Sequence, residues 1–381
     1  MSKLNRTYFK NPMFLVLYLI FLILILGACS QKEQVKLKVP VKNEKPKSPV
    51  TTTIGDKWKL PISIPEGEFS KLAGWLSENQ VLYITNLDQT SSIYRYNLLS
   101  GKNDLIYKSE YPIVNVVISP SKKSILIHAS QSSSEGIVTV IDTKGAEILK
   151  KSFQSYELGF EWNPFNETQV LVTKFAEDWS FQVLLVDLRR STTSELDVPK
   201  PFIKWLARNE IAFINWDEDH PSSYAPLNVK NIVNKSEKTL FPSLIDFSTF
   251  QDLLMTISVN EQDQSVASYS FFDKKQKRLA VFSMPQLTRY SDWLVPFYDY
   301  NEQKRQFITL KPLSSGDADS YTDGFQLIIY NLKNDSSSLV MEGLDNEPMI
   351  LSPTGEALLF GNRFEKIIDL DAKKIYELIK E

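Results

Sequence analysis

Ser352-Pro353-Thr354-Gly355-Glu356-Ala357-Leu358-Leu359-Phe360 joins a Ser-Pro turn to a short apolar strand, and Ile368-Asp369 closes the next apolar run. Asp suits the end of a strand because its side chain bonds the backbone two residues on and tolerates left-handed geometry. Short β-branched and aromatic runs bounded by turn residues are typical of strands. This stretch therefore predicts a strand–turn–strand unit of an all-β fold.

The same unit recurs along the chain. Seven strand-like runs end in Asn or Asp, at intervals of 45, 45, 44, 42, 58 and 38 residues. The seven ends are Tyr96-Asn97, Ile141-Asp142, Val186-Asp187, Lys230-Asn231, Phe272-Asp273, Tyr330-Asn331 and Ile368-Asp369. A period of this length indicates repeated units of a few strands each.

A second marker follows the same period. Four tryptophans lie 87, 43 and 88 residues apart, close to two, one and two repeats: Trp75, Trp162, Trp205 and Trp293. Where tryptophan is missing, Ile118-Ser119-Pro120 and Leu351-Ser352-Pro353 take the same position. We predict that these tryptophans pack where neighbouring units meet.

Repeats of about 40–45 residues with four strands each predict a β-propeller of four-stranded blades. The second unit illustrates the pattern, with strands expected at Ile113–Ile118, Ser124–Ala129, Ile137–Ile141 and Ala146–Lys151. The repeat count is seven, or six if the fifth unit, around residues 246–286, is irregular. Residues 58–64 form an extra candidate strand that would close the ring beside the last unit and hide a sheet edge.

The N-terminus has the features of a secretory signal. Lys3, Arg6 and Lys10 precede an apolar run from Met13 to Leu26, and no acid interrupts them. The run is shorter than the roughly 20 residues of a membrane-spanning helix. The run ends in Leu26-Gly27-Ala28-Cys29, which resembles the lipobox of bacterial lipoproteins. The resemblance implies cleavage after residue 28 and a diacylglycerol on Cys29; the alternative is an uncleaved signal anchor.

Composition sets the remaining boundaries. Residues 29–56 are rich in Lys and Pro and predict a disordered tether, followed by a propeller domain over residues 57–381. Cys29 is the single cysteine, so no disulfide is expected in the domain. The net charge of −3 does not resemble the basic footprint of a nucleic-acid-binding protein. The expected partners are the membrane and a cell-wall component or membrane protein.

Few motifs suggest chemistry. The chain lacks a Gly-x-Ser-x-Gly elbow, and we predict no cofactor. Its two histidines are His128, in an expected strand, and His220, in an acidic loop that could supply a metal ligand or an acid/base pair. A second acidic loop lies in the interval of 58 residues and is a weak candidate for Ca²⁺, through Asp317, Asp319 and Asp323.

Trp179 and Trp216 fall outside the tryptophan period, in or beside expected loops. They are therefore the candidate ligand-binding residues. Three functions remain open: a non-catalytic binding or scaffold module at the cell surface, a cell-wall glycan-binding protein, and a hydrolase or lyase of polysaccharide or peptide. The third requires carboxylates or metal ligands that converge on one face.

The Ser-Pro turn with its apolar strand resembles the repeats of bacterial propellers of the TolB and WD40-like type. The lipobox, the lysine-rich spacer and the C-terminal propeller together resemble the YqgU-like lipoproteins of Bacillus-type bacteria. This resemblance implies six blades, where the repeat count predicts seven. It implies no activity, and no catalytic residues can be carried over from it.

Overall fold

The computed structural model describes residues 53–380, except 218, 221 and 291. Residues 51–381 belong to one compact unit. The predicted signal, the lipidation site Cys29 and the tether up to residue 52 lie outside the described residues. Within the described part, no helix has the length and apolar character needed to span a bilayer.

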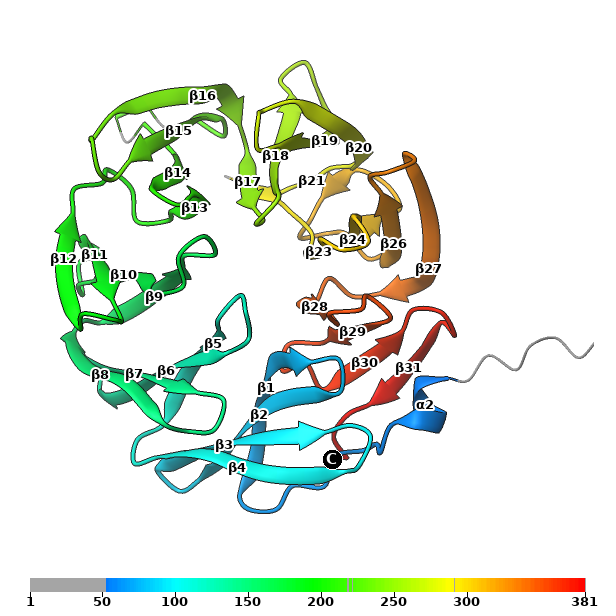
Figure 1. The fold of residues 1–381 in the computed structure, drawn as a ribbon. Coiled ribbons are helices and arrows are strands. Elements are labelled where there is room, and N and C mark those ends of the chain that lie inside the picture. The colour runs from blue at the N-terminus through cyan, green and yellow to red at the C-terminus, as the bar shows by residue number, and fades with distance from the viewer. Residues whose placement is uncertain (1–52, 218, 221, 291, 381) are drawn as a thin grey trace, which may run out of the picture. The chain divides into compact units, whose positions relative to one another are not determined.

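Four-stranded antiparallel sheets follow one another around a ring, and each is one contiguous stretch of chain (Figure 1). Blade 1 holds β1 (Glu68–Ser77), β2 (Gln80–Leu87), β3 (Thr90–Asn97) and β4 (Lys102–Ser109). Blade 2 holds β5 (Ile113–Ile118), β6 (Ser124–Ser132), β7 (Glu135–Asp142) and β8 (Glu147–Gln154). Blade 3 holds β9 (Glu157–Trp162), β10 (Gln169–Phe175), β11 (Phe181–Asp187) and β12 (Thr192–Leu196). Blade 4 holds β13 (Lys204–Ala207), β14 (Glu210–Ile214), β15 (Ala225–Asn231) and β16 (Glu237–Leu244).

The second half of the ring repeats the pattern. Blade 5 holds β17 (Asp246–Thr249), β18 (Leu253–Asn260), β19 (Asp263–Asp273) and β20 (Arg278–Pro285). Blade 6 holds β23 (Tyr298–Asn301), β24 (Gln306–Pro312), β26 (Phe325–Asn331) and β27 (Ser336–Leu344), and blade 7 holds β28 (Met349–Leu351), β29 (Ala357–Phe360), β30 (Lys366–Asp369) and β31 (Lys374–Glu377). A small extra sheet contains β21 (Leu287–Thr288), β22 (Trp293–Leu294) and β25 (Gly316–Asp317). Residues 53–380 thus contain seven blades, the fifth included, and the predicted all-β propeller is confirmed.

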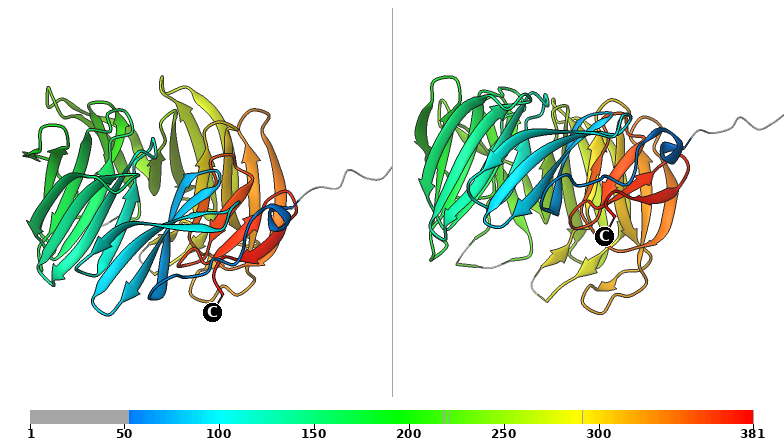
Figure 2. Two further views of the ribbon diagram at one scale, coloured as in Figure 1. Left: turned by 60° about the horizontal axis from the view of Figure 1, so that its bottom comes forward. Right: turned by 90° about the horizontal axis from the view of Figure 1, so that it is seen from below.

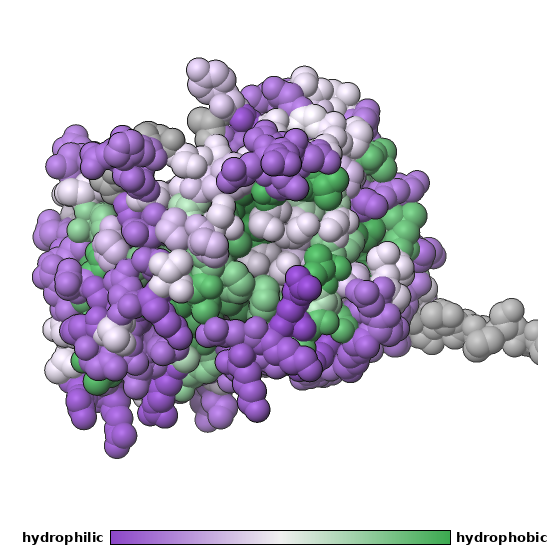
Figure 3. Space-filling model, turned by 90° about the horizontal axis from the view of Figure 1, so that it is seen from above, coloured by the Kyte–Doolittle hydropathy of each residue, from purple (hydrophilic) through white to green (hydrophobic). Residues whose placement is uncertain are grey.

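We call the strands of each blade A to D, from the innermost to the outermost. The B strands read as nearly unbroken apolar runs, as in β2, because neighbouring blades cover both of their faces. The D strands are largely exposed, as in β27, because water covers their outer side. Hydrophilic residues accordingly dominate the outer wall, with smaller hydrophobic patches between them (Figure 3).

The strand order gives the ring two different faces. The A–B and C–D connections lie on one face, here called the turn face, and the B–C and D–A connections lie on the other, here called the loop face. The predicted Asx turns are present on the turn face: Asn97 Oδ1 accepts the N–H of Leu99 (3.0 Å), and Asp187 Oδ1 accepts the N–H of Arg189 (3.0 Å). The longer loops project from the opposite face (Figure 2).

Periodic tryptophans join neighbouring blades, as predicted. Trp205 is fully buried, and its Nε1 donates to the carbonyl of Glu161 in the preceding blade (3.4 Å). Trp75 Nε1 donates in the same way to the carbonyl of Ile350 in blade 7 (3.2 Å). Trp162 is also buried in an A strand.

Trp293 is buried between blades, as predicted, and its Nε1 donates to the carbonyl of Ser223 in blade 4 (3.0 Å). Its expected place in the repeat, however, is wrong. Trp293 lies in β22 of the extra sheet, and the corresponding A-strand position of blade 6 belongs to Tyr300. Tyr300 pairs with Phe307 as Trp205 pairs with Ile211. The long connection between β20 and β23 shifts this A strand along the sequence, so the interval of 88 residues matches the period by coincidence.

Residues 53–66, here called the leading segment, lie against both the first and the last blade. The segment contains α2 (Ile54–Lys57), so folded structure begins slightly before the expected boundary at residue 57. The predicted closing strand is reduced to a single parallel bridge between Ile62 and Ile379, with the Ile62 N–H bound to the carbonyl of Leu378 (2.7 Å). The segment still reaches blade 7, as expected.

Candidate functional site

The loop face carries a row of cavities that share lining side chains. The first, of about 390 Å³, shares Phe175 with a second of about 220 Å³. The second shares Phe202 with a third of about 400 Å³, and the third shares Trp216 with a fourth of about 600 Å³. Asp246 lines the last three. We call this row the loop-face groove.

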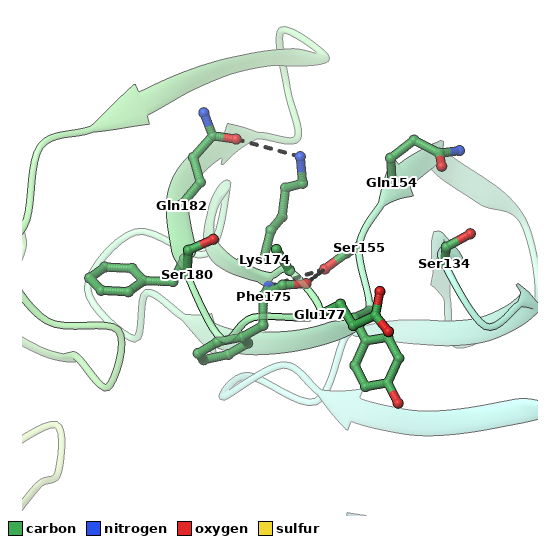
Figure 4. Close-up of a pocket in the computed structure, with 11 residues that line it drawn as sticks. Ser134, Gln154, Ser155, Lys174, Phe175, Glu177, Ser180 and Gln182 are labelled. Atoms are coloured by element: carbon green, nitrogen blue, oxygen red, sulfur yellow. Dashed lines mark hydrogen bonds between the residues drawn. The ribbon is translucent and has the colours of Figure 1, made fainter.

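The first cavity lies between blades 2 and 3 and has a mixed lining (Figure 4). Ser134 and Gln154 stand on one side of it, and Ser180 and Gln182 stand on the other. Lys174 Nζ is 3.4 Å from Gln182 Oε1 across its edge. Polar side chains that can donate and accept hydrogen bonds therefore surround an aromatic floor.

Exposed aromatic rings follow the groove. Trp179 is 62% exposed and packs edge-on against Phe175, with ring centroids 5.9 Å apart. Phe202 is 79% exposed and contacts the same ring from another side, at 5.9 Å. Trp179 holds a left-handed backbone (φ 63°) in the turn between β10 and β11. Single exposed aromatic residues are ordinary, but a contiguous set marks a binding surface.

The structure thus places both predicted tryptophans along one groove. Trp216 lines its third and fourth cavities, and Trp179 stands beside its first. The loops that carry them belong to neighbouring blades, 3 and 4, which are adjacent in the ring although the residues are well separated in sequence. Phe175 and Phe202 complete the aromatic row between them.

A carboxylate occupies the middle of the groove. Asp246 begins β17 and is partly buried, and its Oδ1 accepts the N–H of Phe247 (2.7 Å). Burial raises the pKa of Asp246 to about 6, with a smaller rise from Asp292 and an opposing effect of Lys204. Glu161 lines the same second cavity, where it pairs with Lys204 (2.8 Å). Burial raises the pKa of Glu161 as well, against the effect of Lys204.

The buried carboxylates also tie blades together. Asp299 Oδ2 accepts the N–H of Leu351 in blade 7, and its Oδ1 accepts that of Tyr300, both at 2.7 Å. Burial raises the pKa of Asp299 to about 6 despite these two hydrogen bonds. Glu161 holds the matching position in blade 3 and joins blade 4 through Lys204. Their hydrogen bonds give Asp299 and Glu161 a structural use.

The structure also shows the local contacts within the two acidic loops that carry His220 and Asp317. His220 Nδ1 is 3.2 Å from Asp217 Oδ2, and both side chains are exposed. Asp317 Oδ1 accepts the N–H of Asp319 (2.7 Å), which makes a local turn. Among the residues that the structure describes, no three His, Cys, Asp or Glu side chains gather in a way that could hold a metal ion. Asp317, Asp319 and Asp323 are among these residues.

Sequence reasoning missed the residues that connect the predicted ones. Phe202 follows Pro199-Lys200-Pro201, and an aromatic residue inside a proline-rich loop is a sign of exposure. Asp246 interrupts the apolar run of Leu244, Ile245 and Phe247, and a lone acid there indicates a special environment. Phe175 gave no such signal, because it ends an ordinary strand.

Comparisons with known proteins agree with this fold. The family model of the YqgU-like 6-bladed beta propeller domain matches residues 97–361. An uncharacterized lipoprotein, YqgU of Bacillus subtilis (strain 168), is 25% identical over 320 residues, which cover 84% of this chain and 86% of the relative.

Two solved structures are similar in fold. An uncharacterized protein from Listeria monocytogenes EGD-e has a TM-score of 0.77 and 23% identity, over 84% of this chain and 97% of that one. The β-propeller domain of the Trilobed protease from Pyrococcus furiosus, described as having an open velcro topology, has a TM-score of 0.55 and 13% identity, over 82% of this chain and 98% of that one.

Proposed function

Because the chain belongs to the YqgU-like family of six-bladed β-propeller domains, we propose that it is a lipid-anchored, extracytoplasmic binding module without catalytic activity. The observation that carries the binding role is the loop-face groove, with its exposed rings at Trp179 and Phe202. Burial of such rings under a ligand supplies most of the affinity of a typical binding surface. The proposed anchor is the diacylglycerol on Cys29.

The anchor has a direct test. We expect a Cys29→Ala variant to fold normally and to leave the membrane fraction, since the folded domain contains no other cysteine. Labelling with a radioactive fatty acid and fractionation of cells would measure both effects. A misfolded variant, or an unlipidated variant that stays with the membrane, would contradict this division of roles.

The groove has a separate test with a matched control. A photo-crosslinking amino acid at Trp179 or at Trp216 should capture a cell-envelope component in living cells. The same amino acid at Leu105, an exposed side chain on the outermost strand of blade 1, should not. Equal capture at all three positions, or none at the groove positions, would refute the role of the groove.

A glycan is the second candidate ligand, and the mixed lining of the first cavity favours it. Flat aromatic rings stack on sugar rings, and the nearby amide and hydroxyl groups can bond sugar hydroxyls. We expect Trp179→Ala and Trp216→Ala each to weaken retention on purified peptidoglycan about tenfold or more, as loss of an aromatic anchor commonly costs over 1 kcal/mol. Leu105→Ala should leave retention unchanged.

The same assay tests the absence of catalysis. Glu161 and Asp246 line one cavity, which is the arrangement that a hydrolase or lyase would need. We expect no soluble products from peptidoglycan, because Glu161 is engaged with Lys204. Products that vanish in an Asp246→Asn variant would replace the binding module with an enzyme.

A further inference from the structure

Charge divides the two faces of the ring. Between the strand bounds given above, the connections of the turn face hold about twice as many Lys and Arg as Asp and Glu. Basic residues still outnumber acidic ones when the four Asp residues that end C strands are added. The described connections of the loop face hold about five times as many Asp and Glu as Lys and Arg.

The basic side chains of the turn face are available to a partner. Arg190, Lys235 and Lys275 sit in the C–D turns of three successive blades, and all three are exposed. Two apolar side chains of the turn face are exposed as well: Val233 at 69%, in the same turn as Lys235, and Leu99 at 48%, in the C–D turn of blade 1. Basic residues around exposed apolar ones match an anionic lipid surface, which offers headgroup charge above acyl chains.

The chain also enters the propeller at the turn face. The N–H of Ile54 donates to Asp369 Oδ2 (2.9 Å), and Asp369 ends the C strand of blade 7. The N–H of Lys59 donates to the carbonyl of Leu98, in the C–D turn of blade 1 (2.6 Å). Figure 2 shows α2 away from the long loops. The described part of the chain therefore begins at the basic face.

We propose that the turn face docks on the anionic bilayer that holds the anchor, so that the loop-face groove points away from the membrane. The inference rests on the anchoring part of the proposed function, since the tether keeps the propeller near the bilayer. The acidic loop face is repelled from the same surface, and both effects select one orientation. A free anionic polymer has the same negative charge as the bilayer but no acyl chains beneath it.

The first experiment measures vesicle binding of residues 29–381 carrying Cys29→Ala, so that docking is read apart from lipidation. Arg190→Glu, Lys235→Glu and Lys275→Glu together should weaken binding to phosphatidylglycerol–phosphatidylcholine vesicles at least about tenfold. Lys108→Glu, Lys150→Glu and Arg289→Glu make the same charge change on the outer wall and loop face, and should have little effect. Equal loss in both triple variants, or none in the first, would overturn the proposal.

The second experiment reads the orientation. With Cys29 replaced, the described domain has no thiol, so one environment-sensitive dye can be placed at Val233→Cys or at Tyr290→Cys. On anionic vesicles, the dye at position 233 should shift to the blue and the dye at position 290 should not. The opposite result would mean that the aromatic loop face meets the membrane, and would overturn the proposal. Soluble teichoic acid that shifts the dye as strongly as vesicles would also overturn it.

Discussion

At the scale of the residue, the contacts between neighbouring blades include buried polar groups whose pKa values are shifted by burial. His128 is 7% exposed at the boundary of blades 2 and 3, with its ring 5.5 Å from Phe160. Its Nδ1 has no hydrogen-bond partner among the described residues. Burial lowers the pKa of His128, so folding favours the neutral ring. An unpaired buried polar atom of this kind costs about 1–3 kcal/mol.

This histidine makes stability depend on pH in a defined direction. A lowered pKa in the folded state means that stability is present above the unfolded pKa of about 6.5 and is lost as the pH falls below it. We expect His128→Leu to be at least as stable as the wild type at pH 7.5 and clearly more stable at pH 5. Thermal unfolding at both pH values measures the difference.

The second histidine supplies the control. His220 lies in an exposed loop outside the contacts between blades, so His220→Leu controls for the loss of a histidine as such. Asp246 and Asp299, with raised pKa values near 6, act in the opposite direction. The stability that their protonated carboxyl groups contribute is lost as the pH rises through 6. They are present in all three proteins and cancel in the comparison. A His128→Leu profile parallel to the wild type would contradict the burial argument.

At the scale of the element, the leading segment connects the first and last blades of the ring, and we call it the clasp. No described blade combines strands from both ends of the chain. The segment binds blade 1 through Trp58, whose ring centroid is 5.9 Å from that of Trp75, and through the bond from Asn103 Nδ2 to the carbonyl of Ser63 (3.0 Å). It binds blade 7 through Ile54 and Ile62.

Weakening the clasp should loosen the first and last blades before the others. Ile62 is 2% exposed, and truncation of a buried Ile costs about 2–5 kcal/mol. We expect Ile62→Ala to lower the unfolding temperature and to speed hydrogen exchange in β1 and β28 more than in β13. Val233→Ala, at an exposed turn, is the matched control. Faster exchange spread evenly over all blades would argue against a clasp.

At the scale of the whole molecule, the sequence predicted the propeller because an Asn or Asp marks the end of the third strand in each repeat. Asn97 and Asp187 bond the turns that follow them, so their period reports the blades directly. The position of Trp293 in the repeat was predicted incorrectly because the period assumes connections of equal length, and the connection before β23 is long. Trp179 and Trp216 could be singled out as exceptions to the period. Their alignment along one groove depends on ring geometry, which a linear pattern does not contain.

Each blade is one contiguous stretch of chain, and this has a consequence for how the gene can change. In a ring whose closing blade combines strands from both ends, inserting or deleting a repeat must preserve a split sheet. Here a duplication or deletion of about 45 codons adds or removes one entire blade, and only the clasp must meet a new neighbour. The family model, described as six-bladed, matches residues 97–361, whereas residues 53–380 of this chain contain seven blades. A chain built in this way can gain or lose a blade without rebuilding a sheet that is shared between its two ends.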